Sequence, residues 1–118
     1  MPEIKRPLSV TLIALLYLAV GTVGFVYHGY ESLTTHPFPR DAYAIELTEF
    51  LAIVAGAFIL RGKNWARWLA IAWMAFHVAI SVFHPVRELA THAVLLLLIA
   101  WILFRPEATR YFRNAEAT

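Results

Sequence analysis

Residues 8–27 read LSVTLIALLYLAVGTVGFVY, a run without a single charged side chain. A helix needs about 20 apolar residues to cross the hydrocarbon core of a bilayer, and this run has that length. It is longer than the roughly 7–15 residues of a signal-peptide core, and no small-x-small cleavage site follows it. We therefore predict that this stretch is a retained transmembrane helix.

Three more apolar segments follow the first, separated by residues that interrupt helices. The separators are His36-Pro37-Phe38-Pro39, Gly62-Lys63-Asn64, His84-Pro85 and Arg105-Pro106. Proline ends or starts a helix, because it lacks the N–H that an interior position must donate. We predict spans at 8–28, 44–61, 65–84 and 86–104. The predicted fold is all-α, a single transmembrane domain (1–118) forming an antiparallel four-helix bundle, with an outer loop at 29–43 and a short cytoplasmic tail at 105–118.

The composition agrees with a membrane location and excludes several kinds of chemistry. Sixty per cent of the 118 residues are hydrophobic and 15% are charged, whereas a soluble domain has about 25% charged residues. The absence of cysteine excludes disulfides, a thiolate nucleophile and a dithiol relay. No basic stripe interleaved with aromatic residues indicates a nucleic-acid partner.

The basic residues predict the orientation. Most of them fall on one side of the four predicted spans, and only Arg40 and Arg87 fall on the other. The first group comprises Lys5, Arg6, Arg61, Lys63, Arg67, Arg105, Arg110 and Arg113. Because loops rich in Lys and Arg stay in the cytoplasm, we predict a multi-pass inner-membrane protein with both termini cytoplasmic and the lipid bilayer as its surroundings.

Ionisable side chains inside the spans are the candidate functional residues, because each is costly in a bilayer. Counted along the helices, Glu49, His77 and His92 lie at a similar depth, roughly 8–11 Å from the outer face. Ser81 shares a helix face with His77 at the i, i+4 spacing. The predicted ligand-binding set is Glu49, His77, His92, His28, Glu46 and Ser81.

The first span presents a face of small residues and two polar aromatic rings. Tyr17, Gly21, Gly24 and His28 recur at helical spacing along it. Small residues allow close helix contacts in membranes. We therefore expect this face to point toward the other spans.

Several functions agree with this polar layer. In the first, the side chains hydrogen-bond one another and only specify helix register. In the second, they line a pocket for a small apolar ligand, lipid head group or quinone. In the third, Glu49, His77 and His92 bind a metal ion or haem. The leading interpretation is an accessory or ligand-holding protein. The alternative is a membrane redox, metal-binding or quinone-binding enzyme subunit that uses Glu49, His77 and His92. A third possibility is a structural subunit of a homo-oligomer or larger complex. The sequence shows no nucleophile–base pair, so it leaves open whether the chain is an enzyme.

Two stretches and one short segment carry a family resemblance. They are Gly24-Phe25-Val26-Tyr27-His28-Gly29, Glu49-Phe50-Leu51-Ala52-Ile53-Val54-Ala55-Gly56 and Leu60-Arg61-Gly62. With the spacing of the spans over residues 8–104, this layout resembles the DoxX-like family of small four-helix bacterial membrane proteins. The resemblance implies a membrane subunit linked to quinone or sulfur redox chemistry, or one that partners a soluble enzyme. The lack of cysteine argues against a thiol relay.

Overall fold

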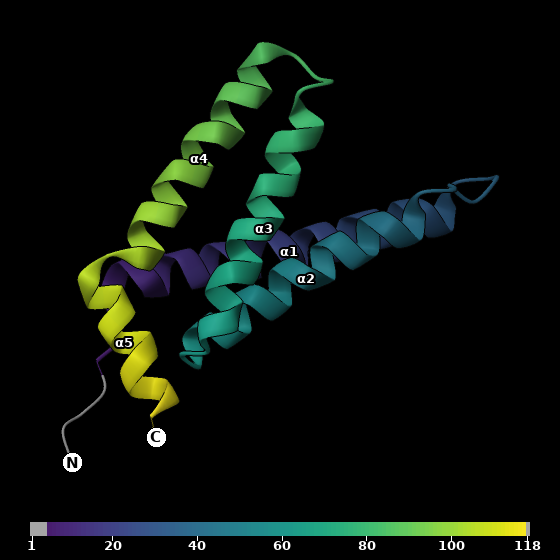
Figure 1. Ribbon diagram of the computed structural model, residues 1–118. Helices are drawn as coiled ribbons and strands as arrows, with labels where there is room; N and C mark the ends of the chain where they lie inside the picture. Colours follow the sequence, from purple (N-terminus) through teal and green to yellow (C-terminus); the bar gives the residue numbers. More distant parts are fainter. Residues whose placement is uncertain (1–4, 118) are drawn as a thin grey trace.

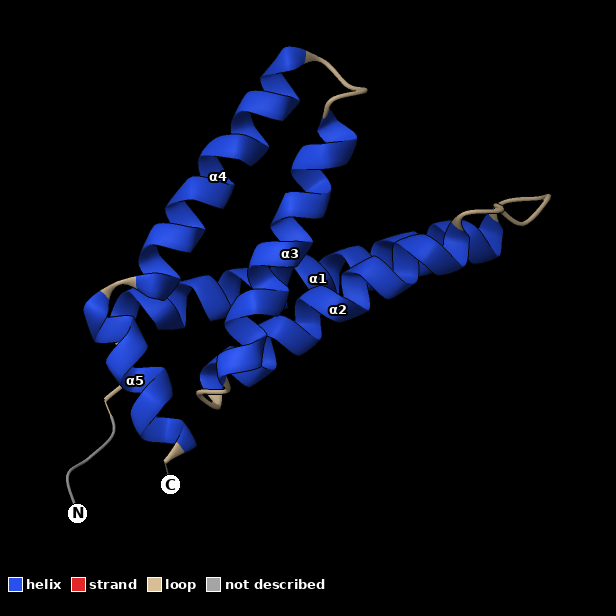
Figure 2. Cartoon of the chain, viewed as in Figure 1, coloured by secondary structure: helices blue, strands red, loops and turns tan. Residues whose placement is uncertain are grey.

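The computed structural model describes residues 5–117, and every regular element in that range is a helix (Figure 2). The helices are α1 (Leu8–Thr34), α2 (Ala42–Leu60), α3 (Asn64–Ser81), α4 (Val86–Phe104) and α5 (Pro106–Glu116). The predicted all-α class is confirmed.

The helix boundaries follow the predicted interruptions. Gly62 has a positive φ of 74°, which a residue without a Cβ adopts at little cost. Pro85 is the N-cap of α4, and Pro106 is the first residue of α5. The largest difference is at the first loop, because α1 continues past residue 28 to Thr34 and leaves a shorter connection to Ala42.

The segment predicted as a short tail folds as the amphipathic helix α5. Ala108, Tyr111 and Phe112 are buried on one face of α5. The Tyr111 hydroxyl donates hydrogen bonds to the carbonyls of Leu60 and Ile59, at 2.9 and 3.2 Å. Helix α5 is therefore docked on the end of α2 through an apolar face that the sequence analysis did not use.

The first four helices form two antiparallel hairpins, α1–α2 and α3–α4 (Figure 1). The hairpins meet where α5 and the Gly62 turn lie, which we call the α5 end, and they diverge toward their own loops. The antiparallel four-helix bundle that we predicted is not confirmed, because a fifth helix is present and the two hairpins pack together near one end. The short Gly62 turn and the docked α5 hold the hairpins together at one end only.

Three contacts fix the place where the hairpins cross. The Tyr17 hydroxyl of α1 donates a 2.6 Å hydrogen bond to the Ala70 carbonyl of α3. The indole N–H of Trp73 donates to the Thr48 carbonyl of α2 at 2.8 Å. The rings of Tyr17 and Trp73 lie 5.3 Å apart, centroid to centroid. These side chains border the buried core, which lies toward the α5 end.

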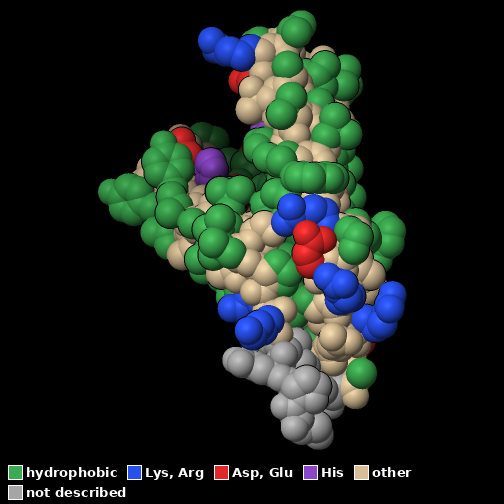
Figure 3. Space-filling model, turned by 90° about the vertical axis from the view of Figure 1, so that its left-hand side faces the viewer, with side chains coloured by type: hydrophobic (Ala, Val, Ile, Leu, Met, Phe, Trp, Pro, Cys, Tyr) green, Lys and Arg blue, Asp and Glu red, His purple; other side chains and the backbone are tan. Residues whose placement is uncertain are grey.

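The surface agrees with a membrane environment. Within the described residues, α1, α2 and α4 are long and apolar enough to cross a bilayer. Helix α3 is outside this group, since it carries Asn64, Arg67 and His77. Large apolar side chains are exposed, among them Phe83 at 88% and Val86 at 78%. Apolar side chains cover much of the visible face, whereas most of its Lys and Arg gather toward the α5 end (Figure 3).

Candidate functional site

Glycine residues on α1 bring α2 close and shape the surroundings of Glu49. A Cβ at position 24 would lie 2.5 Å from the carboxyl carbon of Glu49, and one at position 21 would lie 2.8 Å from the Glu49 carbonyl oxygen. The expectation that this face of the first span points toward another span is confirmed. The Glu49 carboxyl group sits directly over Gly24, and its side chain is only 14% exposed.

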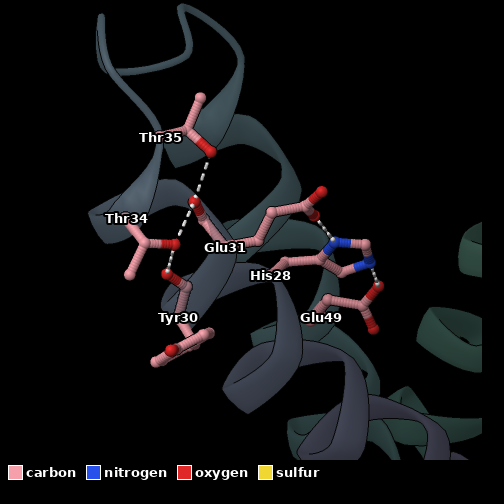
Figure 4. A network of polar contacts seen from close by, with 6 residues as sticks. All are labelled: His28, Tyr30, Glu31, Thr34, Thr35 and Glu49. Carbon is pink, nitrogen blue, oxygen red and sulfur yellow. Dashed lines mark hydrogen bonds and ion pairs between the residues drawn. The ribbon is translucent and has the colours of Figure 1, made fainter.

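His28 of α1 lies between the carboxylates of Glu31 and Glu49 (Figure 4). Its Nε2 is 3.9 Å from Oε1 of Glu49, and its Nδ1 is 3.7 Å from Oε2 of Glu31. Both are ion-pair distances rather than hydrogen bonds, so they attract only when the imidazole is protonated. The other oxygen of Glu49, Oε2, is buried and has no hydrogen-bond partner among the described residues.

The two histidines of the second hairpin are linked through Ser81. The Ser81 hydroxyl donates a 2.6 Å hydrogen bond to the His77 carbonyl, and the same oxygen contacts Nδ1 of His92. Nδ1 of His77 lies 2.8 Å from the Trp73 carbonyl. The two imidazole rings lie 6.0 Å apart, centroid to centroid.

These hydrogen bonds determine which ring nitrogen carries the proton. A carbonyl oxygen only accepts, so Nδ1 of His77 must be the donor toward Trp73. The single proton of Ser81 is already directed at a carbonyl, so Nδ1 of His92 must donate to the Ser81 oxygen. Both neutral histidines are therefore Nδ1–H tautomers, and the lone pair of each Nε2 stays available as an acceptor.

Glu49, His77 and His92 line one cavity of about 280 Å³ between the hairpins. All four long helices contribute to its wall, and most other lining residues are apolar. The apolar and aromatic lining residues are Leu16, Tyr17, Val20, Trp73, Met74, Leu95 and Ile99. Within the described chain, no hydrogen bond or ion pair joins Glu49 to either histidine. The three side chains share the cavity without satisfying one another across it.

The remaining predicted residues lie outside the cavity wall. His28 pairs with Glu49, and Ser81 acts through His92. Glu46 lines a separate hollow of about 430 Å³ with Phe25 and Phe38, and its Oε1 is buried without a partner among the described residues. Glu46 is therefore not brought to the histidines.

The metal alternative finds no support in this geometry. Among residues 5–117, no three His, Asp or Glu side chains are placed to share a metal ion. Glu49 is held over Gly24 and beside His28, on the first hairpin. His77 and His92 are held by bonds within the second hairpin.

Sequence reasoning missed the structural roles of three residues at the α5 end, Arg67, Tyr111 and Phe112. Arg67 is buried at the α5 end, where it donates to the Leu103 carbonyl and Thr109 hydroxyl, both at 3.1 Å. Its guanidinium lies over the rings of Phe104 and Phe112 at 4.4 and 4.8 Å. From the sequence, Arg67 contributes only to the charge asymmetry that predicts orientation. The pair Tyr111-Phe112, three and four residues after Ala108, was the available signal for a buried helix face here.

Comparison with known proteins finds no matching family model, no similar curated protein and no similar solved structure. The resemblance to the DoxX-like family therefore stays a prediction.

Proposed function

We propose that this chain is a multi-pass inner-membrane protein that holds a small apolar ligand in the cavity between its hairpins. It crosses the membrane four times, with both termini and α5 on the cytoplasmic side. The hairpins act as two halves of an antiparallel membrane bundle that is packed at the α5 end and open toward the loops. Three apolar helices and the basic α5 end support this placement.

One observation carries the binding proposal. An otherwise apolar cavity is lined by Glu49 from the first hairpin and by His77 and His92 from the second. Among the described residues, no hydrogen bond or ion pair joins the Glu49 carboxylate to either imidazole across the cavity. If these groups only fixed helix register, they would be expected to pair across the gap, because an unsatisfied buried polar group costs about 1–3 kcal/mol. Oε2 of Glu49 is such a group. A ligand that reaches it would remove that cost.

The chemistry of the lining suggests the class of ligand. Neutral His77 and His92 present Nε2 acceptors, and an ionised Glu49 only accepts. The cavity therefore suits a molecule that donates hydrogen bonds, such as one with hydroxyl groups. Its volume of about 280 Å³ is just below the roughly 300–1,000 Å³ of drug-sized sites, so it fits a single ring or head group, with any tail leaving between the diverging hairpins.

The second candidate is a redox subunit that takes protons from a quinol. The same Nε2 lone pairs favour it, because each can accept one of the two protons released when the quinol is oxidised to a quinone, while its two electrons pass to an electron acceptor in a partner enzyme. Glu49 and His28 would then offer a path toward the loop tip of α1–α2. An absorbance spectrum and metal analysis of the purified protein separate this candidate from a metal or haem enzyme, since quinol chemistry needs neither group in this chain.

Native mass spectrometry of the protein purified in mild detergent tests the binding proposal. We expect a small bound molecule in the wild type, and its loss in Glu49→Ala and His92→Ala. Glu46→Ala is the matched control, because it removes another glutamate of α2 that does not line the cavity. Equal retention by the wild type and Glu49→Ala, or equal loss in Glu46→Ala, would contradict the proposal.

A further inference from the structure

A second hollow, at the α5 end, combines three basic side chains from two segments. The chain just before α1 supplies Lys5 and Arg6, and α5 supplies Arg110, with Asn114 beside them. The groove they line measures about 550 Å³. One carboxylate, Glu107, also lines it, and Oε1 of Glu107 already lies 3.9 Å from Nε of Arg105. The groove is therefore net positive.

Arg6 is held in a fixed orientation. Its Nε donates to the Thr11 hydroxyl at 2.8 Å, and its NH1 donates to the Leu60 carbonyl at 2.9 Å. No hydrogen bond from residues 5–117 uses its other terminal nitrogen, NH2. Within residues 5–117, Lys5 and Arg110 have no carboxylate partner. A planar guanidinium placed in this way suits the oxygens of a phosphate.

The position of the groove distinguishes a lipid from a soluble anion. The apolar surface of α1 starts directly after Pro7, and Leu8 is already 72% exposed. Apolar side chains give way to Lys and Arg toward the α5 end (Figure 3), and the residues that line the groove belong to this end. In a bilayer this boundary is the depth of the lipid head groups, and basic pockets on the cytoplasmic side bind acidic head groups.

We propose that the groove between residues 5–7 and α5 binds the phosphodiester head group of an anionic phospholipid. The phosphate lies between Lys5, Arg6 and Arg110, and the acyl chains lie against the exposed apolar side of α1. A bound lipid links the start of α1 to α5 and so strengthens the packing at the α5 end. The proposal does not depend on a ligand in the cavity between the hairpins.

The test uses the full chain in nanodiscs of phosphatidylcholine with graded amounts of phosphatidylglycerol. Thermal unfolding and native mass spectrometry report stabilisation and retained phosphatidylglycerol. We expect Arg110→Gln and Lys5→Gln each to weaken retention about fivefold, since one basic residue near an anionic surface contributes about 1 kcal/mol. Arg113→Gln is the matched control, because Arg113 lies on the same helix, is exposed and lines a different hollow.

Two results would overturn the proposal. The first is an equal loss of phosphatidylglycerol retention in Arg113→Gln and Arg110→Gln, which would indicate only a diffuse basic surface. The second is equal stabilisation of the wild type by glycerol phosphate in pure phosphatidylcholine nanodiscs, which would indicate a soluble anion. Lys5→Gln keeps the test decisive if Arg110→Gln unfolds early in pure phosphatidylcholine, because Lys5 precedes the first helix.

Discussion

Ser81 links the two cavity histidines and holds the tautomer of His92. It accepts from Nδ1 of His92 and donates to the carbonyl of His77, and it is itself 2% exposed. The i, i+4 spacing predicts that Ser81 shares a helix face with His77, but it indicates no partner on another helix. The hydroxyl is close to His92 because the turn between α3 and α4 is short.

Ser81→Ala is expected to release the tautomer of His92 while leaving that of His77 in place. His92 loses its acceptor, whereas Nδ1 of His77 still donates to Trp73. The expected cost in unfolding free energy is about 1–3 kcal/mol, because a polar group loses its partner. Nitrogen NMR shifts of the two imidazoles measure the tautomers directly. A His92 signal that stays in the Nδ1–H form would contradict the role given to Ser81.

At the scale of elements, the α1–α2 hairpin depends on glycine where two backbones approach. A Cβ at position 56 would lie 2.6 Å from the Ala14 carbonyl oxygen and 3.0 Å from the Leu18 nitrogen. A Cβ at position 29 would be no closer than 3.5 Å to the nearest atom, Oε2 of Glu46. Backbone atoms cannot move aside as the end of a side chain can.

Gly56→Ala should therefore destabilise the protein, whereas Gly29→Ala should not. The first forces the helices apart and should cost about 1–3 kcal/mol of unfolding free energy. The second meets no clash and should be neutral or gain up to about 1 kcal/mol from helix propensity. Thermal unfolding in one detergent compares the two. A Gly56→Ala variant as stable as Gly29→Ala would refute the close approach of α1 and α2.

At the scale of the whole molecule, α5 joins the two hairpins. Phe112 is 1% exposed and lies under the guanidinium of Arg67, while Tyr111 bonds to the end of α2. Phe112→Ala should lower the unfolding free energy by about 3–5 kcal/mol, as expected for emptying a buried aromatic site. Arg113→Ala, at an exposed position on the same helix that does not line the groove of Lys5, Arg6 and Arg110, serves as the control. Equal melting temperatures of the two variants would show that α5 is not a structural part of the protein.

Reporter fusions test the proposed placement in the membrane. Alkaline phosphatase, which is active only outside the cytoplasm, should be active when fused at Thr35 and inactive when fused after Thr118. The charge asymmetry motivates this expectation, because basic flanks stay in the cytoplasm. Activity of the C-terminal fusion would show that the C-terminus lies outside the cytoplasm. Four spans that start from a cytoplasmic N-terminus would then be excluded.

The sequence by itself determined the helices, because apolar runs and their interruptions are local features. The positions of the Gly62 turn, Pro85 and Pro106 already mark most helix ends. Depth along each helix also suggested that Glu49, His77 and His92 share a level, and the structure places them around one cavity. Whether that cavity binds a ligand stays a prediction.

Only the tertiary structure decided how the helices are arranged around Glu49, His77 and His92. The divergence of the hairpins, the docking of α5 and the separation of Glu46 from the histidines depend on contacts between distant residues, such as Tyr17 with Ala70 and Tyr111 with Leu60. Hydrophobic periodicity cannot specify such pairs, since an apolar helix face in a membrane protein packs equally well against lipid or another helix. The tautomer of His92 follows from the same packing, because its Nδ1 donates to Ser81 of another helix. That of His77 is set locally, by the Trp73 carbonyl one turn earlier in α3.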